Sequence, residues 1–324
     1  MREEAVARLA LTIGPALTSG FRRRGSPAIA TTAKLTERTS EPPRLRVVER
    51  VRELWTFREI LWNLVRKELK VKYTASVLGA VWSLLNPVIF LAVFWFVSEV
   101  LLSGIPHYPV YLLSGLLAWN LLSVSLSTGA QSVISNANLV KKVYFPREIL
   151  PLSTVGVALV DFVLQSAVLL LYLLASGYGF TVSTLWLYPI AFVALLTFTT
   201  AVTFLVSALN VRYRDVQHLL GLGLLVWFWL TPIVYQGFLV QDRLADVSLG
   251  PSTAWQAYLL NPAAAIVFGF QRALYDDAAG DVLPAFSSGE LAGMLAVVIV
   301  ASTVLLALTW RLYFSMSGDF AEEL

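Results

Sequence analysis

Long runs of apolar residues dominate the chain after residue 77, and short polar stretches separate them. A helix needs about 20 apolar residues to cross the hydrocarbon core of a bilayer, and six runs reach that length. The sequence therefore predicts an all-α integral membrane protein with six transmembrane helices. The expected spans are 78–102, 110–134, 150–172, 185–209, 216–235 and 291–313.

One further uncharged run, residues 247–271, is long enough to span but is interrupted by Pro251 and by the pair Asn261-Pro262. Proline lacks a backbone donor and disfavours helix in the residue before it, so each piece extends over only about ten residues. The sequence therefore predicts short re-entrant helices at about 247–275, whose irregular backbone must be covered by protein or line a cavity. A continuous seventh span is the alternative.

The basic residues fall on one side of these spans. Most of the 24 lysines and arginines lie before residue 76, in the loops 135–149 and 210–217, or at Arg311; only Arg243 and Arg272 lie in the opposite loops. Cytoplasmic loops of membrane proteins have an excess of Lys and Arg. We therefore expect a multi-pass protein of the plasma membrane, with both termini in the cytoplasm.

Two segments precede the first span. Residues 1–53 mix charges with Pro, Ser, Thr and Ala, which is typical of a flexible cytoplasmic extension. Residues 54–76 have apolar side chains at helical spacing, with basic residues and tryptophans around them, which predicts an amphipathic interface helix at the membrane surface. A helix packed on a soluble partner would show the same pattern. The transmembrane domain then covers residues 77–324.

Composition narrows the chemistry that the chain can perform. It is 57% hydrophobic and 14% charged, with a mean hydropathy of +0.70, whereas soluble domains have about 25% charged residues. It has no cysteine and two distant histidines, His107 and His218, which argues against metal sites built from these residues. The sequence contains neither a phosphate-binding loop nor a hydrolase motif. Its basic residues indicate which loops face the cytoplasm and do not indicate a nucleic-acid surface. We therefore expect no cofactor and no catalysis in this chain.

Polar and aromatic residues inside the spans are candidates for a conduit. Asp161 is the one acid well inside a predicted span, and structural hydrogen bonding, conduit lining and proton coupling all remain open for it. The aromatic residues belong either to the interfacial belt or to a surface on which sugar rings stack. The densest group is WFWLTPIVY at 227–235, where Pro232 is expected to bend or end the fifth span. The candidates are Trp82, Trp119, Asp161, Trp227, Trp229 and Tyr235.

The polar stretch NANLVKKVYFPREILP, residues 136–151, separates the second and third predicted spans. Its three basic residues place it in the cytoplasm, and Pro151 suits the first turn of the third span. Because the chain has no phosphate-binding loop, any use of ATP would require another protein. A solvated connector is the plain alternative reading of this loop.

Five sequence blocks occur in a recognisable order. They are KYTASVLGAVWSLLNPV (72–88), NLVKKVYFPREILPL (138–152), LNVRYRDV (209–216), WFWLTPIVY (227–235) and LNPAAAIVFGFQRAL (260–274). Together with the final FAEEL, they resemble permease subunits of ABC type-2 exporters, and most closely the polysaccharide and teichoic-acid (O-antigen-like) exporter group. The resemblance covers residues 54–324 and leaves out the N-terminal extension.

The resemblance implies a transport subunit and not an enzyme. Two copies of the chain would pair around a conduit, and two copies of a separate ABC ATPase, which binds ATP and Mg²⁺, would dock below. The cargo would be a polyprenyl-lipid-linked polysaccharide or teichoic-acid-like polymer, moved from the cytoplasmic to the outer face. A drug or a lipid is the alternative cargo. A membrane-embedded transferase using outer acids such as Asp276 and Asp277 is the alternative from another class.

The resemblance also implies sites. The loop after the second span would form a coupling helix seated in the ATPase, and NVRYRD would form a second contact. These coupling residues are Asn138, Leu139, Lys141, Lys142, Tyr144, Arg147, Arg212, Arg214 and Asp215. The interface helix would lie where the lipid-linked substrate enters, and its basic residues would attract a pyrophosphate head group or anionic membrane lipids. These residues are Arg66, Lys67, Lys70 and Lys72.

Overall fold

A computed structural model describes residues 47–73, 85, 88–89, 92–93, 96, 105–179, 182–249, 252–277, 280 and 282–324. The predicted first span, 78–102, therefore lies outside the described residues apart from isolated positions, as do residues 1–46 of the predicted extension. The described part is helical except for turns, irregular stretches and one two-residue antiparallel ladder, β1 (Ser248–Leu249) with β2 (Ser252–Thr253).

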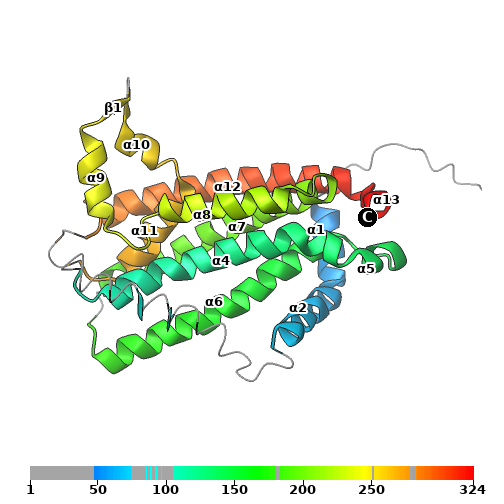
Figure 1. Ribbon diagram of the computed structural model, residues 1–324, viewed down its shortest axis with the longest axis horizontal. Helices are drawn as coiled ribbons and strands as arrows, with labels where there is room; N and C mark the ends of the chain where they lie inside the picture. The colour runs from blue at the N-terminus through cyan, green and yellow to red at the C-terminus, as the bar shows by residue number, and fades with distance from the viewer. Residues whose placement is uncertain are drawn as a thin grey trace, which may run out of the picture. The chain divides into compact units, whose positions relative to one another are not determined.

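Four described helices are long and apolar enough to cross a membrane (Figure 1): α4 (Tyr108–Ser135), α6 (Ile149–Ser176), α7 (Leu187–Arg212) and α12 (Ser288–Ser317). At 1.5 Å per residue each is about 40 Å long, which exceeds the roughly 30 Å of hydrocarbon in a bilayer. They agree within a few residues with four of the predicted spans. The expected all-α membrane architecture is therefore present.

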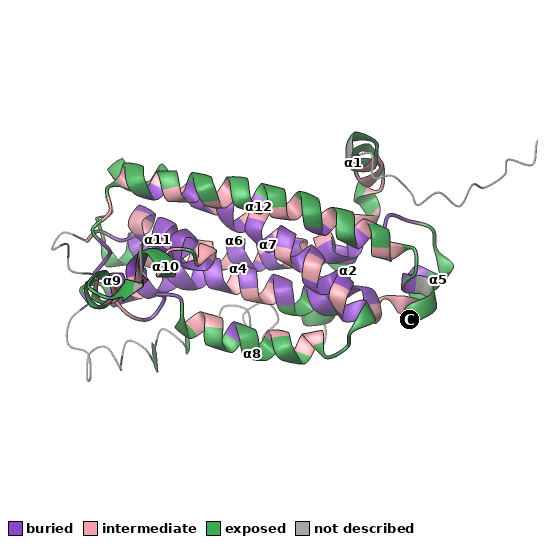
Figure 2. Ribbon diagram, turned by 90° about the horizontal axis from the view of Figure 1, so that it is seen from above, coloured by how far each residue is buried: buried purple, intermediate pink, exposed green. Residues whose placement is uncertain are grey.

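α4 is the central helix of this bundle. It packs against α6, α7 and α11, and 78% of its most apolar stretch is buried, compared with 17% for α12. The outer side of α12 exposes Val297, Val300, Val304 and Leu308 at helical spacing (Figure 2). An apolar stripe on the outside of a long helix suits contact with lipid.

The fifth predicted span, 216–235, is shorter as a helix than the sequence indicated. α8 (Val216–Trp229) has 14 residues and a length of about 21 Å. Pro232 accounts for the end, because it has no backbone N–H to donate to the carbonyl four residues earlier. Thr231 instead donates to the Phe228 carbonyl at 3.2 Å, and the chain runs irregularly to α9 (Gly237–Ala245).

The predicted interface helix is divided into α1 (Val47–Thr56) and α2 (Arg58–Tyr73). Helix therefore begins within the segment predicted as a flexible extension. With the break at Phe57, α1 contacts the start of α6 through Arg50 while α2 packs alongside α6. Gly156 permits this approach, because a Cβ there would lie 2.9 Å from Cγ2 of Val65 on α2.

The uncharged run 247–271 does not form one helix. α10 (Ala254–Tyr258) and α11 (Pro262–Leu274) are separated at 259–261, where the Asn261-Pro262 pair predicts a break. The Asn261 side chain caps α11 by accepting from the backbone N–H of Ala263 at 3.1 Å. α11 is buried against α4, α7 and α12, so this segment adds to the core and not to the row of long spans.

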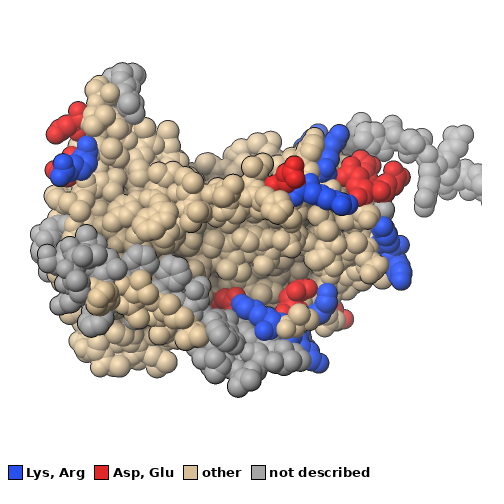
Figure 3. All heavy atoms as spheres, viewed as in Figure 1, with Lys and Arg blue, Asp and Glu red and all other residues tan. Residues whose placement is uncertain are grey.

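The remaining short helices lie at the two ends of the bundle (Figure 1). α5 (Ala137–Lys142) and α13 (Phe320–Glu323) lie near α1 and α2 at one end, whereas α9, α10 and the β ladder lie at the other. A 3-10 turn, η2 (Val182–Thr184), precedes α7. On the face shown in Figure 3, the charged side chains gather mainly toward these two ends, as a membrane-spanning bundle requires.

The close packing of α4 on α7 predicts a stability effect at Gly129. A Cβ at this position would lie 2.3 Å from Thr203 Cγ2, so Gly129→Ala is expected to destabilise the protein by about 1–3 kcal/mol. Thermal unfolding in detergent, followed by circular dichroism, measures this effect. Gly223→Ala on α8 is the control, because no described atom lies within 4 Å of its added Cβ. Equal midpoints for the two variants would contradict the close approach.

Candidate functional site

The loop between α4 and α6, residues 136–148, forms a tip at one end of the bundle (Figure 1). It is called the coupling tip here, after the role that the family resemblance predicts for it. Its outermost part exposes Val143 and Tyr144, which are 46% and 84% accessible to solvent. Its base is fixed, since Val140 and Phe145 are buried in a cluster that also contains Leu64 of α2. The coupling tip therefore presents an exposed aromatic residue on an anchored base.

All the predicted coupling residues lie at this end of the bundle. On the tip, Leu139 and Arg147 are half-buried, and the exposed residues are Asn138, Lys141, Lys142 and Tyr144. Arg212, at the end of α7, and Arg214 and Asp215, in the turn before α8, are also exposed. Asn210 holds that turn beside α4: its amide donates to the Ala130 carbonyl at 2.8 Å and accepts from the Gln217 backbone at 3.1 Å. The structure thus brings the two predicted contacts to one end.

Behind the tip, Glu148 joins three elements. Its carboxylate accepts two hydrogen bonds of 2.7 Å from the Arg50 guanidinium on α1 and one of 3.3 Å from the Trp310 indole on α12. Glu148 is fully buried, and Arg50 also pairs with Glu53 and lies over the Phe314 ring, 5.0 Å from its centroid. A two-point arginine–carboxylate pair fixes both distance and orientation.

The acidic partners of Arg50 favour the charged form of its guanidinium. Burial lowers the pKa of the guanidinium, but the hydrogen bonds and charges of Glu148 and Glu53 raise it by more, so the pKa of Arg50 is raised overall. Sequence reasoning missed this pair. Arg50 lies in the segment predicted as a flexible extension, and Glu148 follows Arg147, which suggested no distant partner. The available signal was an isolated acid directly before an apolar helix.

Arg147 ties the tip to the C-terminal end of α12. Its guanidinium donates to the Gly318 carbonyl at 3.4 Å, and its own carbonyl accepts from the Tyr313 hydroxyl at 3.0 Å. Tyr313 is fully buried and packs edge-on against Phe320 of α13, with ring centroids 5.3 Å apart. The coupling tip is therefore braced by α1, α12 and α13.

Two of the four predicted head-group residues bond to other parts of the bundle. Lys72 lies 2.7 Å from the Asp161 carboxylate of α6, which is 5% exposed. Lys67 donates to the Asn136 side chain at 3.0 Å. Of the other two, Lys70 is exposed, and the guanidinium of Arg66 lies 5.0 Å from the centroid of the Trp62 ring. Asp161 thus makes a structural ion pair; conduit lining and proton coupling stay predictions.

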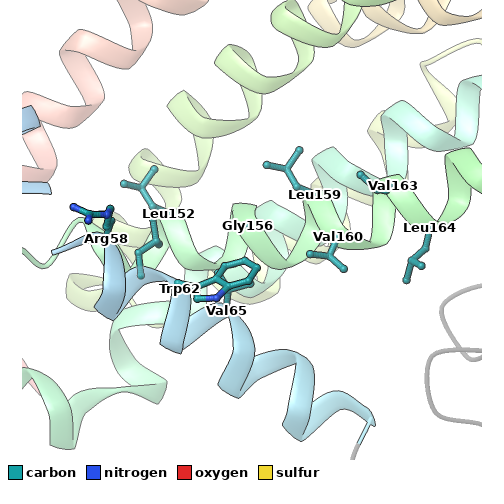
Figure 4. Close-up of a pocket in the computed structure, with 10 residues that line it drawn as sticks. Arg58, Trp62, Val65, Leu152, Gly156, Leu159, Val160, Val163 and Leu164 are labelled. Carbon is teal, nitrogen blue, oxygen red and sulfur yellow. The ribbon is translucent and has the colours of Figure 1, made fainter. Parts of the chain in front are cut away.

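An apolar groove of about 500 Å³ lies between α2 and α6 (Figure 4). Trp62 and Val65 form its α2 side, the α6 side extends from Leu152 to Leu164, and Arg58 lies at one end. Along α6 this distance is about 18 Å. A long apolar groove with a cation at one end matches the shape and polarity of a lipid that has an anionic head group.

The candidate conduit aromatics occupy different environments. Trp119 is 7% exposed and packs edge-on against Trp227, with centroids 6.3 Å apart, and the Trp227 indole donates to Asn261 at 2.8 Å. Trp229 is 54% exposed and Tyr235 is half-buried. Trp82 lies outside the described residues. The structure therefore brings Trp119 and Trp227 together within the core and leaves Trp229 on the surface.

Side chains from α4 and α11 bind the irregular backbone that follows α8. Tyr111 donates to the Tyr235 carbonyl at 2.6 Å, Tyr108 to the Val234 carbonyl at 3.1 Å, and Gln271 to the Pro232 carbonyl at 3.0 Å. Sequence reasoning missed these three donors, although a tyrosine pair and a glutamine inside apolar stretches are a usable signal. They allow the helix break at Pro232 to lie within the bundle.

Comparison with known proteins gives matches over most of the chain. Residues 59–237 match the family described as ABC-2 type transporter. The O-antigen export system permease protein RfbA of Myxococcus xanthus is 32% identical over 279 residues, which is 86% of this chain and 100% of that protein. Two Klebsiella pneumoniae proteins of the same name are 33% and 31% identical over 188 residues, 58% of this chain and 73% of each relative.

The ion pair between Lys72 and Asp161 is expected to stabilise the attachment of α2 to α6. Asp161→Asn should lower the free energy of unfolding by about 1–2 kcal/mol, less than for a fully buried pair because the Lys72 side chain is 39% exposed. A double-mutant cycle with Lys72→Met, measured by thermal unfolding in detergent, isolates the interaction. Glu68→Gln, which removes only an exposed contact with Lys67, is the control. Strict additivity in the cycle would rule out the pair as a stabilising contact.

Proposed function

The chain belongs to the ABC-2 type transporter family, and on this basis we propose that it is the membrane subunit of an ATP-driven exporter. Its cargo is a polyprenyl-lipid-linked polysaccharide or teichoic-acid-like polymer, moved from the cytoplasmic to the outer face of the membrane. The relatives named as O-antigen export permeases favour a polysaccharide over a drug or a lipid as cargo. The observation that supports the transport role most directly is the exposed coupling tip on its braced base.

Energy for export comes from a separate ATPase, which binds ATP and Mg²⁺. Two copies of the ATPase dock at the end of the bundle that bears the coupling tip and the α7–α8 turn. Tyr144 and Tyr213 are 84% and 55% exposed there, among basic residues. Exposed tyrosines on a rigid support are frequent anchors of protein–protein interfaces. This end is therefore the cytoplasmic side, and both termini lie on it.

Six spans and a pair of permeases complete the assembly. The apolar residues 78–102 provide the first span, and α8 with the irregular stretch after it provides the fifth. α8 exposes Leu219, Leu222, Leu225 and Val226, each at least 59% accessible in the single chain. An apolar helix too short to span alone, with most of its surface uncovered, supports a second copy of the chain as its neighbour around a conduit.

The lipid-linked substrate enters beside the interface helices. The groove between α2 and α6 accepts part of the polyprenyl chain, and the pyrophosphate lies near the cations of α2. Arg58, Arg66 and Lys70 are exposed cations for this role, whereas Lys67 bonds to Asn136 of the tip and Lys72 to Asp161 of α6. A single basic helix next to an apolar groove supports recognition of an amphipathic anion through charge and burial together.

The function is tested by reconstituting the permease with its candidate ATPase in vesicles. A polyprenyl-diphosphate-linked glycan is expected to stimulate ATP hydrolysis. Stimulation by phospholipid or by drug-like molecules, with no response to the glycan-lipid, would support the alternative cargo instead. Failure of the two chains to copurify under all conditions would contradict the ATPase partnership.

Tyr144→Ala is expected to weaken binding of the ATPase by about 2 kcal/mol or more, because an exposed aromatic anchor loses its contact area. This corresponds to about a 30-fold rise in Kd, measured by titration of the purified permease with the ATPase. Leu239→Ala, at a position 49% exposed on α9 at the other end, is the control and should leave Kd unchanged. If Tyr144→Ala leaves both ATPase binding and transport unchanged, the tip is not part of the interface with the ATPase.

A further inference from the structure

The interface helices hold the coupling tip at both points where it leaves the bundle. At its start, Asn136 accepts a hydrogen bond of 3.0 Å from Lys67 of α2. At its end, Glu148 accepts two of 2.7 Å from Arg50 of α1. Leu64 of α2 also shares a buried cluster with Val140 of the tip. The tip is therefore bonded to α1 and α2 as well as to its own flanking helices.

We propose that Glu148 is a positioning residue that transmits displacement of the coupling tip to the interface helices, and thereby changes the groove between α2 and α6. The inference rests on the proposed function, in which the tip is the contact for the ATPase. Glu148 contacts neither ATP nor substrate. It acts by keeping α1 fixed to the tip while the tip moves.

Glu148, and not Asn136, makes the mechanically firm contact. Glu148 is fully buried, binds Arg50 through both carboxylate oxygens, and is oriented by the Trp310 indole. The Lys67 side chain is 54% exposed, and single hydrogen bonds of exposed lysines are easily replaced by water. Breaking a buried charge pair is far more costly than breaking an exposed one.

A second fixed contact, at the far end of α2, determines how α2 responds when α1 moves. The far end of α2 is held by the pair between Lys72 and Asp161, 2.7 Å apart, on the same helix α6. Along α6, Glu148 and Asp161 are about 20 Å apart. Much of the groove in Figure 4 lies between these two points, with Gly156 and Val160 in its lining, and its α6 side continues past Asp161 to Leu164.

Glu148 caps α6, and its carbonyl accepts a hydrogen bond from the backbone N–H of Leu152. If displacement of the tip shifts Glu148 with the first turn of α6, and α1 follows while Lys72 stays bound to Asp161, α2 must tilt relative to the rest of α6 and the groove must change width.

The absence of cysteine from the sequence allows a direct measurement. Val160→Cys places one thiol in the groove, and its rate of reaction with a maleimide is followed in vesicles that contain the permease–ATPase complex. With Glu148 intact, ATP is expected to change this rate by about fivefold or more, the lower end of typical coupling between distant sites. In Glu148→Gln, the ATP-dependent change should disappear while ATP hydrolysis and copurification of the two chains are retained.

Two further variants keep the test decisive. Lys67→Gln is the matched control at the other end of the tip and should retain the ATP-dependent change. The charge-swapped pair Arg50→Glu with Glu148→Arg should restore part of it. An ATP response that persists in Glu148→Gln would overturn the proposal. Loss of the ATP response in Glu148→Gln together with loss of ATP hydrolysis and assembly would also overturn it. So would absence of the ATP response in the charge-swapped variant, if that variant still assembles and hydrolyses ATP.

The outcome also separates this inference from the proposed function. If the complex with Glu148 intact assembles and hydrolyses ATP but the thiol at position 160 never responds to ATP, the proposed transmission through Glu148 is wrong and the transport function stands. If the permease binds no ATPase, the proposed function itself fails before Glu148 is tested.

Discussion

A bilayer offers no water to backbone amides and carbonyls, and this constraint determines where the chain can depart from helix. The clearest departure follows α8, where Pro232 ends the helix within the bundle. The backbone carbonyls freed by this break accept hydrogen bonds from Tyr108 and Tyr111 of α4 and from Gln271 of α11. Burial of α4 and α11 in the core and the break in α8 therefore depend on each other.

The same constraint applies to buried charges, which need partners within the protein. Two buried carboxylates, Glu148 directly before α6 and Asp161 within it, meet a cation from α1 and α2, Arg50 and Lys72 respectively. A buried carboxylate without such a partner would be strongly destabilising. α1 and α2 thus neutralise one acid directly before α6 and one within it, and the same contacts fix the position of α1 and α2 against α6.

Local signals in the sequence were sufficient for the long helices and insufficient for the contacts between them. Apolar length predicted α4, α6, α7 and α12, and proline predicted the breaks near Pro232 and Asn261, because both effects act within one segment. The pair of Arg50 with Glu148 joins residues 98 positions apart, and no periodicity or motif reports such a contact. The cations of α2 illustrate the same limit: all look equivalent in sequence, yet Lys72 is held in an ion pair and Lys70 is exposed.

The burial of α4 has a consequence for the molecule as a whole. Its first turns donate to the irregular backbone at the outer end, and its last residue, Ser135, leads directly into the coupling tip. A 28-residue helix is about 42 Å long and resists compression along its axis. α4 therefore connects the loop 136–148 at one end of the bundle with the hydrogen-bonded backbone around Pro232 at the other end through a single continuous helix.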